Sequence, residues 1–151
     1  MNTNLPDSAI LVVDDDEGEV ELISMAIDDL KLPYRIDVAR QGFAVLDHLH
    51  QRGKYADRPA GLPVLVILDN KMPMMSGVEA MREIAKVKAF QAVPIVMFSA
   101  SASDTDMAEA YAAGVNSYVV KPMGAMQFKE AVHAIVTYWT KINSSGNSLD
   151  L

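Results

Sequence analysis

Five short apolar runs constrain the fold of this chain more than any other feature. They lie at residues 10–13, 34–38, 64–68, 94–98 and 117–120, and each has the length of a buried β-strand. A helical pattern separates each run from the next, so the chain alternates strand and helix. Such alternation predicts a parallel sheet with right-handed crossovers and helices on both faces.

The segments between the runs carry apolar residues three or four positions apart, as an amphipathic helix does. The expected helices lie at residues 20–30, 43–49, 78–85, 105–113 and 128–142, the last being the longest. Pro33 and Gly114 mark the ends of the first and fourth helices. Five such units predict an α/β, flavodoxin-like (βα)5 doubly wound sheet with strand order 2-1-3-4-5.

The length and pattern of the chain indicate one domain. It has 151 residues, half of them hydrophobic, with no internal repeat and no linker. We expect the domain to span residues 9–142, between a flexible N-terminus at 1–8 and a flexible tail at 143–151.

Charge and composition exclude several classes of protein. The net charge of −7 argues against DNA binding, which calls for clustered Lys and Arg. The absence of cysteine excludes disulfides and thiolate sites. The apolar runs are too short to cross a membrane, and the first eight residues do not resemble a signal peptide. A cytoplasmic location is therefore expected.

Polar residues follow four of the runs at the point where each strand should end. Asp14 and Asp15 follow the first run, Asp69 the third, Ser99 the fourth and Lys121 the fifth. The carboxyl ends of parallel strands share one edge of a sheet, and ligands bind at the switch point, here between strands 1 and 3. The sequence therefore predicts one site that holds Asp14, Asp15 and Asp69 together.

That set of groups suits phosphoryl chemistry with a metal ion. Carboxylates this close raise at least one pKa unless a cation compensates, and an all-oxygen cluster with few protein ligands suits Mg²⁺. Lys121 can pair with a phosphoryl oxygen, and the Ser99 hydroxyl can donate a hydrogen bond. Phosphoryl transfer needs chiefly such positioning and charge neutralisation.

Each residue taken alone also has an ordinary structural interpretation. The acids at 14–17 could be a helix-start cluster, Asp69 a turn residue, Ser99 a turn serine, Lys121 a solvated lysine and Tyr118 part of a strand core. The combination favours a site. The scattered histidines, for which we expect surface or partly packed positions, are His48, His50 and His133.

The motifs around these residues resemble the receiver domain of two-component response regulators. Residues 69–77 are similar to the family's D-x-x-M-P-x-M-x-G, and residues 114–122 to its G-A-x-x-Y-x-x-K-P. The resemblance covers roughly residues 9–142. It implies a chemotaxis-type single-domain regulator that is not an enzyme beyond its own phosphorylation and dephosphorylation, and whose output is a protein–protein contact.

The same resemblance implies a role for each site residue. Asp69 would accept a phosphoryl group from a phosphohistidine of a sensor histidine kinase. Ser99 and Tyr118 would form the switch pair, and Lys121 would contact the phosphoryl group. The implied Mg²⁺ ligands are the carboxylates of Asp14, Asp15 and Asp69 and the backbone carbonyl of Lys71.

A finer resemblance is to the single-domain regulators that serve bacterial phytochromes. It rests on residues 52–59, residues 113–118 and the Tyr138-Trp139 pair, although the usual leucine-proline after the acceptor is Met72-Pro73 here. It implies a bacteriophytochrome kinase as partner. We also expect a homodimer, or docking of another partner, through the face of the fourth helix, fifth strand and fifth helix. The alternative is that Trp139 only covers the core.

The same residues allow two other functions. A metal-dependent phosphatase of the haloacid-dehalogenase type would use Asp14, Asp16, Ser99 and Lys121, but it leaves Asp69 unexplained and lacks a later acidic pair. A non-phosphorylated receiver-like binding module is the other. We also expect a cis Lys121–Pro122 bond, so that the lysine turns inward.

Overall fold

The computed structural model describes residues 8–145. Its sheet has five parallel strands in the order β2-β1-β3-β4-β5, which confirms the predicted topology. The strands are β1 (Ala9–Val13), β2 (Arg35–Ala39), β3 (Leu65–Leu68), β4 (Ile95–Ser99) and β5 (Ser117–Val120). The domain bounds 9–142 stay a prediction, and most of the two ends expected to be flexible, at 1–7 and 146–151, lies outside the described residues.

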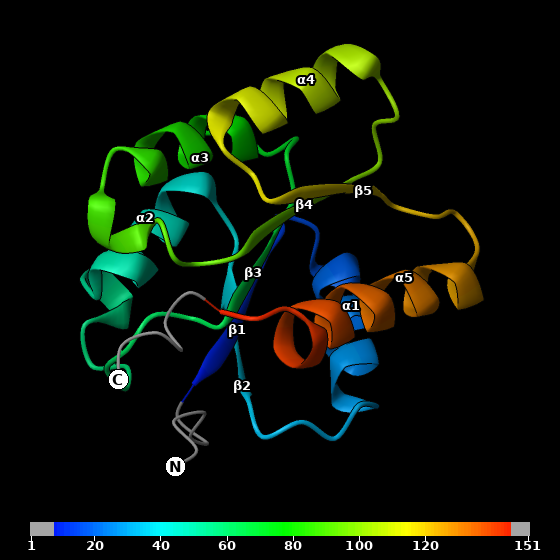
Figure 1. Ribbon diagram of the computed structural model, residues 1–151, viewed down its shortest axis with the longest axis horizontal. Helices are drawn as coiled ribbons and strands as arrows, with labels where there is room; N and C mark the ends of the chain where they lie inside the picture. The colour runs from blue at the N-terminus through cyan, green and yellow to red at the C-terminus, as the bar shows by residue number, and fades with distance from the viewer. Residues whose placement is uncertain (1–7, 146–151) are drawn as a thin grey trace.

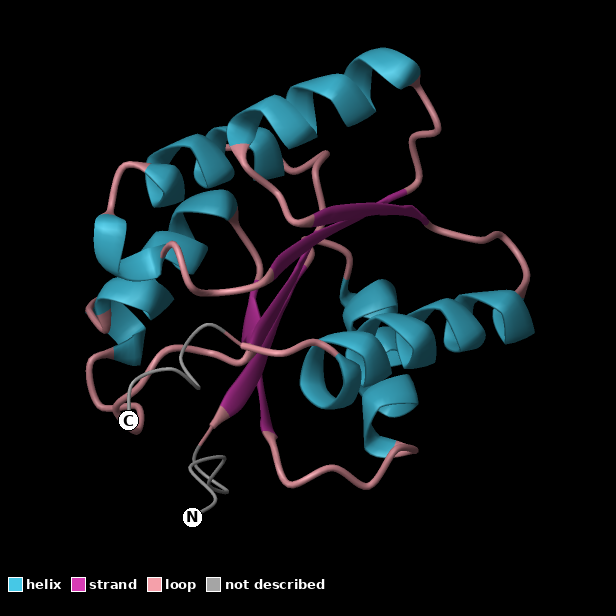
Figure 2. Cartoon of the chain, in the orientation of Figure 1, coloured by secondary structure: helices cyan, strands magenta, loops and turns pink. Residues whose placement is uncertain are grey.

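Five α-helices connect and cover the strands, close to where the sequence predicts them. They are α1 (Glu17–Asp28), α2 (Gly42–His50), α3 (Gly77–Ala85), α4 (Asp104–Ala113) and α5 (Ala125–Thr137). The helices α1 and α5 cover one face of the sheet and α2, α3 and α4 the other (Figures 1 and 2). Within residues 8–145 no helix is long and apolar enough to span a membrane.

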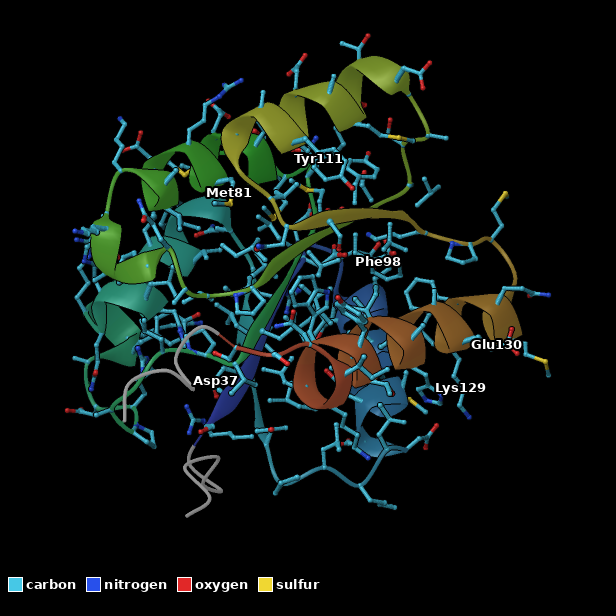
Figure 3. All side chains as sticks on the ribbon, viewed as in Figure 1. Asp37, Met81, Phe98, Tyr111, Lys129 and Glu130 are labelled. Carbon is cyan, nitrogen blue, oxygen red and sulfur yellow. The ribbon has the colours of Figure 1, made fainter. Side chains whose placement is uncertain are left out.

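Alternate residues of the central strands supply two separate cores. Leu11 and Val13 pack toward α2, α3 and α4, whereas Ile10 and Val12 pack toward α1 and α5. Met81 and Phe98 mark the two cores on opposite sides of the sheet (Figure 3). Because both faces are covered, the central strands are apolar throughout, which explains the continuous runs in the sequence.

The end of α5 differs from the single long helix expected. The α-helix ends at Thr137, and a π-helical turn, Tyr138–Ile142, continues it. Trp139 is partly buried against the core on the α1/α5 side, whereas Tyr138 remains 46 % exposed. The two rings meet edge to face at 5.0 Å. Trp139 therefore covers core, as the alternative interpretation had it, and Tyr138 is the exposed aromatic.

The expected position of His48 is wrong. Its side chain is fully buried, and Nε2 lies 2.7 Å from a carboxylate oxygen of Asp37. The histidine falls on the buried face of α2, and Asp37 on the edge strand β2 provides the polar partner that allows its burial. The loop after α2 begins with a 3₁₀ turn, Gly53–Tyr55, and the Tyr55 hydroxyl donates to the carbonyl of Val38.

Candidate functional site

The carboxyl ends of β1 and β3 bring three carboxylates together, as predicted. The backbone N–H of Asp69 donates to the carbonyl of Val13 at 2.9 Å, which fixes the first residue after β3 beside the end of β1. One carboxylate oxygen from each of Asp14, Asp15 and Asp69 lies within 4.8 Å of the other two. The sheet order alone therefore assembles the acidic cluster from residues far apart in the chain.

Lys121 lies inside this cluster. Its Nζ is 2.9 Å from Asp14 Oδ2 and 3.1 Å from Asp69 Oδ1, and only 7 % of the side chain is exposed. No cis peptide bond occurs among the described residues, so the expected cis Lys121–Pro122 bond is wrong. The expectation failed because the lysine reaches both carboxylates from a trans bond, which needs no isomerisation to turn the side chain inward.

Burial and neighbouring charges shift the pKa values of the two central groups, Asp69 and Lys121. Burial, followed by the negative charge of Asp14, raises the pKa of Asp69 to about 6, and Lys121 offsets only part of this. Burial would lower the pKa of Lys121, but the Asp14 hydrogen bond and the charge of Asp69 outweigh it and raise that pKa. Lys121 therefore stays charged, and Asp69 binds a proton more readily than an ordinary aspartate does.

The chemistry of the donor set fits a hard divalent cation. Asp14 and Asp69 are buried, whereas Asp15 is exposed, which leaves the cluster open toward solvent on one side. Mg²⁺ is held in proteins by one or two carboxylates together with waters and phosphate oxygens. Asp14, Asp15 and Asp69 could hold such an ion. The role of the Lys71 carbonyl stays a prediction.

The loop after Asp69 is built so that its backbone packs closely against the acceptor. Asn70 organises it: its carbonyl accepts from the N–H of Gly77 at 2.9 Å, and its side-chain oxygen from the N–H of Val78 at 3.0 Å. A Cβ at Gly77 would lie 2.2 Å from the carbonyl oxygen of Asp69, so no other residue fits there. Met74 has a positive φ of 73°. These contacts explain why the motif ends in a glycine at position 77.

Ser99 and Tyr118 both form hydrogen bonds with Ser101, in the loop that follows β4. Ser99 is fully buried, and its hydroxyl accepts the N–H of Ser101 at 3.2 Å. The Tyr118 hydroxyl donates to the carbonyl of Ser101 at 2.8 Å. The structure thus brings the two residues of the expected switch pair onto the backbone of Ser101.

Glu19 is a site residue that the sequence analysis missed. Its Oε1 lies 3.0 Å from Lys121 Nζ, so the ammonium has a third carboxylate partner. Asp16 caps α1 by accepting the N–H of Glu19, which places Glu19 in the first turn of the helix at the same edge of the sheet. An acidic residue one turn after the Asp14-Asp15 pair is the signal that could have identified it.

Comparison with known proteins gives a consistent result. The family described as "Response regulator receiver domain" matches residues 10–133. The probable methanogenesis regulatory protein FilR2 of Methanothrix harundinacea is 36 % identical over 138 residues, which cover 90 % of this chain and 86 % of that protein.

Two solved structures are similar over nearly the whole chain. The phosphorylated cyanobacterial phytochrome response regulator RcpA has a TM-score of 0.85 at 27 % identity, covering 92 % of this chain and 98 % of that one. The Mn²⁺-bound form of response regulator Rcp1 has a TM-score of 0.83 at 25 % identity, covering 91 % and 98 %. Rcp1 comes from Synechocystis sp..

Proposed function

Because this chain belongs to the response regulator receiver domain family, we propose that Asp69 is its phosphoacceptor and that a sensor histidine kinase supplies the phosphoryl group. Receiver domains are signalling modules of two-component systems, and they bind a divalent metal. The observation that carries the assignment to Asp69 is its position: it is the acid that Lys121 contacts at the carboxyl end of β3, and its pKa is raised.

In the proposed phosphoryl transfer each site residue has a separate role. A carboxylate oxygen of Asp69 attacks the phosphorus of the phosphohistidine, a P–O bond forms, and the P–N bond breaks with its electron pair leaving on the imidazole. Lys121 then pairs with a phosphoryl oxygen instead of the Asp69 carboxylate. Ser99 donates a hydrogen bond to another oxygen. Mg²⁺ bound by Asp14, Asp15, Asp69 and the Lys71 carbonyl would neutralise the charge that gathers there.

The test uses a small phosphoryl donor and the intact mass of the protein. Acetyl phosphate with Mg²⁺ should add one phosphoryl group to the wild type, and Asp69→Asn should abolish the addition. Asp57→Asn, which removes an exposed acid of the loop before β3, is the matched control and should be labelled normally. Labelling that persists in Asp69→Asn would place the acceptor elsewhere.

Removal of the metal gives a second arm of the same test. A chelator should stop the labelling, and Asp14→Asn or Asp15→Asn should weaken Mg²⁺ binding. Equal Mg²⁺ affinity in both variants and in the wild type would contradict the ligand assignment. Labelling that survives chelation would contradict the need for a metal.

The kinase and the output surface are also proposals. The resemblance to RcpA supports a bacteriophytochrome as the kinase, because that regulator is described as a phytochrome response regulator. We propose that output passes through the α4-β5-α5 face and includes a homodimer. Supporting this, β5 is an edge strand with half-buried residues, and Tyr111 of α4 is 50 % exposed beside it. The proposed location of this exchange is the cytoplasm.

Neither of the two other functions considered from the sequence is favoured. The family match favours a receiver over a haloacid-dehalogenase-type phosphatase, which would leave Asp69 without a role. A receiver-like module that is never phosphorylated would not need an acidic cluster of three carboxylates around a buried lysine. The labelling experiment separates the receiver from both.

A further inference from the structure

A chain of side-chain contacts joins the loop after Asp69 to the Tyr118 ring. Its central residue is Asp106, in the first turn of α4. The carboxylate oxygen Oδ2 of Asp106 accepts the Ser101 hydroxyl at 2.5 Å, and it lies 3.5 Å from Nζ of Lys71. Lys71 is two residues after Asp69, so one carboxylate oxygen connects two loops that meet at the phosphoacceptor edge.

Several further hydrogen bonds hold Ser101 in place within this series of contacts. The Ser101 hydroxyl also accepts the N–H of Ser103 at 3.2 Å, and the Ser103 hydroxyl caps α4 by accepting the N–H of Asp106 at 3.3 Å. The Ser101 N–H in turn donates to the hydroxyl of Ser99. These bonds close a ring through residues 99–106, so the Ser101 carbonyl has a fixed position.

The Ser101 carbonyl is the group that holds the Tyr118 ring. The Tyr118 hydroxyl donates to it at 2.8 Å, while the Tyr118 N–H donates to the hydroxyl of Tyr111 at 3.0 Å. Tyr111 lies between α4 and β5 (Figure 3). The position of Ser101 therefore decides whether this partner is available to the ring.

We propose that Asp106 is a positioning residue for signal output, which holds the Ser101 carbonyl in reach of Tyr118 and links it through Lys71 to the acceptor loop. This rests on the proposed function of Asp69. The hydrogen bond from Ser101, and to a lesser degree the charge of Lys71, lowers the pKa of Asp106, which keeps the carboxylate charged at neutral pH. The exposed Lys71 pair adds little stability, and in this proposal it serves only to connect the two loops.

The test follows the Tyr118 ring by fluorine NMR in protein labelled with 3-fluorotyrosine. The chain has five tyrosines, and Tyr118→Phe assigns the resonance of interest. The variants are Asp106→Asn and Ser101→Ala. The matched control is Asp104→Asn, which removes the same charge from the same exposed first turn of α4 but takes no part in the contacts described.

In the wild type, the resonance should shift when beryllofluoride, an analogue of the phosphoryl group, is added with Mg²⁺. In Asp106→Asn and in Ser101→Ala the resting resonance should move toward that of a solvent-exposed tyrosine, and the shift on adding beryllofluoride should be lost. The variant that combines Asp106→Asn with Ser101→Ala should change the Tyr118 resonance no more than either single variant, because both substitutions remove the same link. Labelling of Asp69 by acetyl phosphate should remain at the wild-type level.

The outcomes separate the two proposals. A labelled wild type whose Tyr118 response is kept in Asp106→Asn overturns the role of Asp106 and leaves Asp69 as acceptor. A response lost equally in Asp104→Asn also overturns it, since helix charge alone would then be the cause. A wild type that is neither labelled nor shifted overturns the proposed function, and with it the coupling role.

Discussion

Asp69 is the residue at which burial and charge compete most directly. Its pKa is raised to about 6 by burial and by Asp14, from an ordinary value of 3.8. A raised carboxyl pKa means that the folded state binds more protons than the unfolded state between these two values. The free energy of unfolding therefore falls as the pH rises between these two values. Above the higher value the ionised Asp69 carboxylate destabilises the fold to its full extent.

Asp69→Asn should consequently stabilise the metal-free protein at pH 8, by up to about 3 kcal/mol, and by much less at pH 4.5. Lys121 keeps Asp14 and Glu19 as partners in the variant, so the ammonium is not left alone. Urea unfolding in a chelating buffer measures the difference at both pH values. Asp57→Asn serves as the control, and a stabilisation of Asp69→Asn that does not change with pH would contradict the raised pKa.

Glu19 should slow the phosphorylation of Asp69. It adds a negative charge to a cluster that must accept an anionic phosphoryl donor, and it engages the lysine that the phosphoryl group needs. Because its side chain is one-third exposed, the effect is screened. Glu19→Gln should speed labelling by acetyl phosphate at saturating Mg²⁺ about fivefold, equivalent to about 1 kcal/mol.

Glu21→Gln is the control for that experiment, since Glu21 is exposed on the same helix. Its labelling rate should match that of the wild type. A slower rate in Glu19→Gln would show instead that the glutamate holds Lys121 in a productive position.

At the scale of elements, the segment after α2 depends on one arginine. The Arg58 guanidinium donates twice to the carbonyl of His48 and once each to those of Pro59 and Gly61. It thus ties this loop to the C-terminal turn of α2 at His48, whose side chain pairs with the partly buried Asp37. The segment has no regular structure of its own beyond a short 3₁₀ turn, so these bonds fix its path.

Arg58→Ala should destabilise the fold by about 2 kcal/mol, because two partly buried and two exposed hydrogen bonds are lost and the carbonyl of His48 loses both guanidinium donors. Urea unfolding measures the total, and hydrogen exchange should show faster exchange in residues 51–61 than elsewhere. Arg52→Ala, which removes a largely exposed pair with Asp47, should cost far less. Equal costs for the two variants would show that Arg58 does not organise the loop.

At the scale of the whole molecule, the prediction concerns self-association. Tyr138 is exposed at the end of α5, and an aromatic at an interface centre often dominates its energy. We expect the phosphorylated wild type to dimerise and Tyr138→Ala to shift the equilibrium toward monomer. Sedimentation velocity with and without acetyl phosphate and Mg²⁺ measures this. Phe43→Ala, on α2 across the sheet, is the control.

A monomer in every condition would remove the homodimer and leave output to a different partner. Dimerisation that Tyr138→Ala does not weaken would keep the dimer but move its interface away from the end of α5.

The strand order and the position of the acidic cluster follow from sequence patterns. Continuous apolar runs form central parallel strands because both faces of the sheet are covered, and alternation with helices restricts the connections to right-handed crossovers. Once that order is given, Asp14, Asp15, Asp69 and Lys121 must meet at the carboxyl edge. Gly114, predicted to end the fourth helix, has a φ of 115° there.

Which side chains face one another across elements depends instead on how the elements pack. His48 is buried because Asp37 of β2 is opposite it, and Glu19 reaches Lys121 because α1 starts beside the cluster. The trans Lys121–Pro122 bond and the Asp106–Ser101 contact depend likewise on distances between segments. Local patterns encode periodicity and caps, whereas such pairings arise only when packing brings distant residues within hydrogen-bond range.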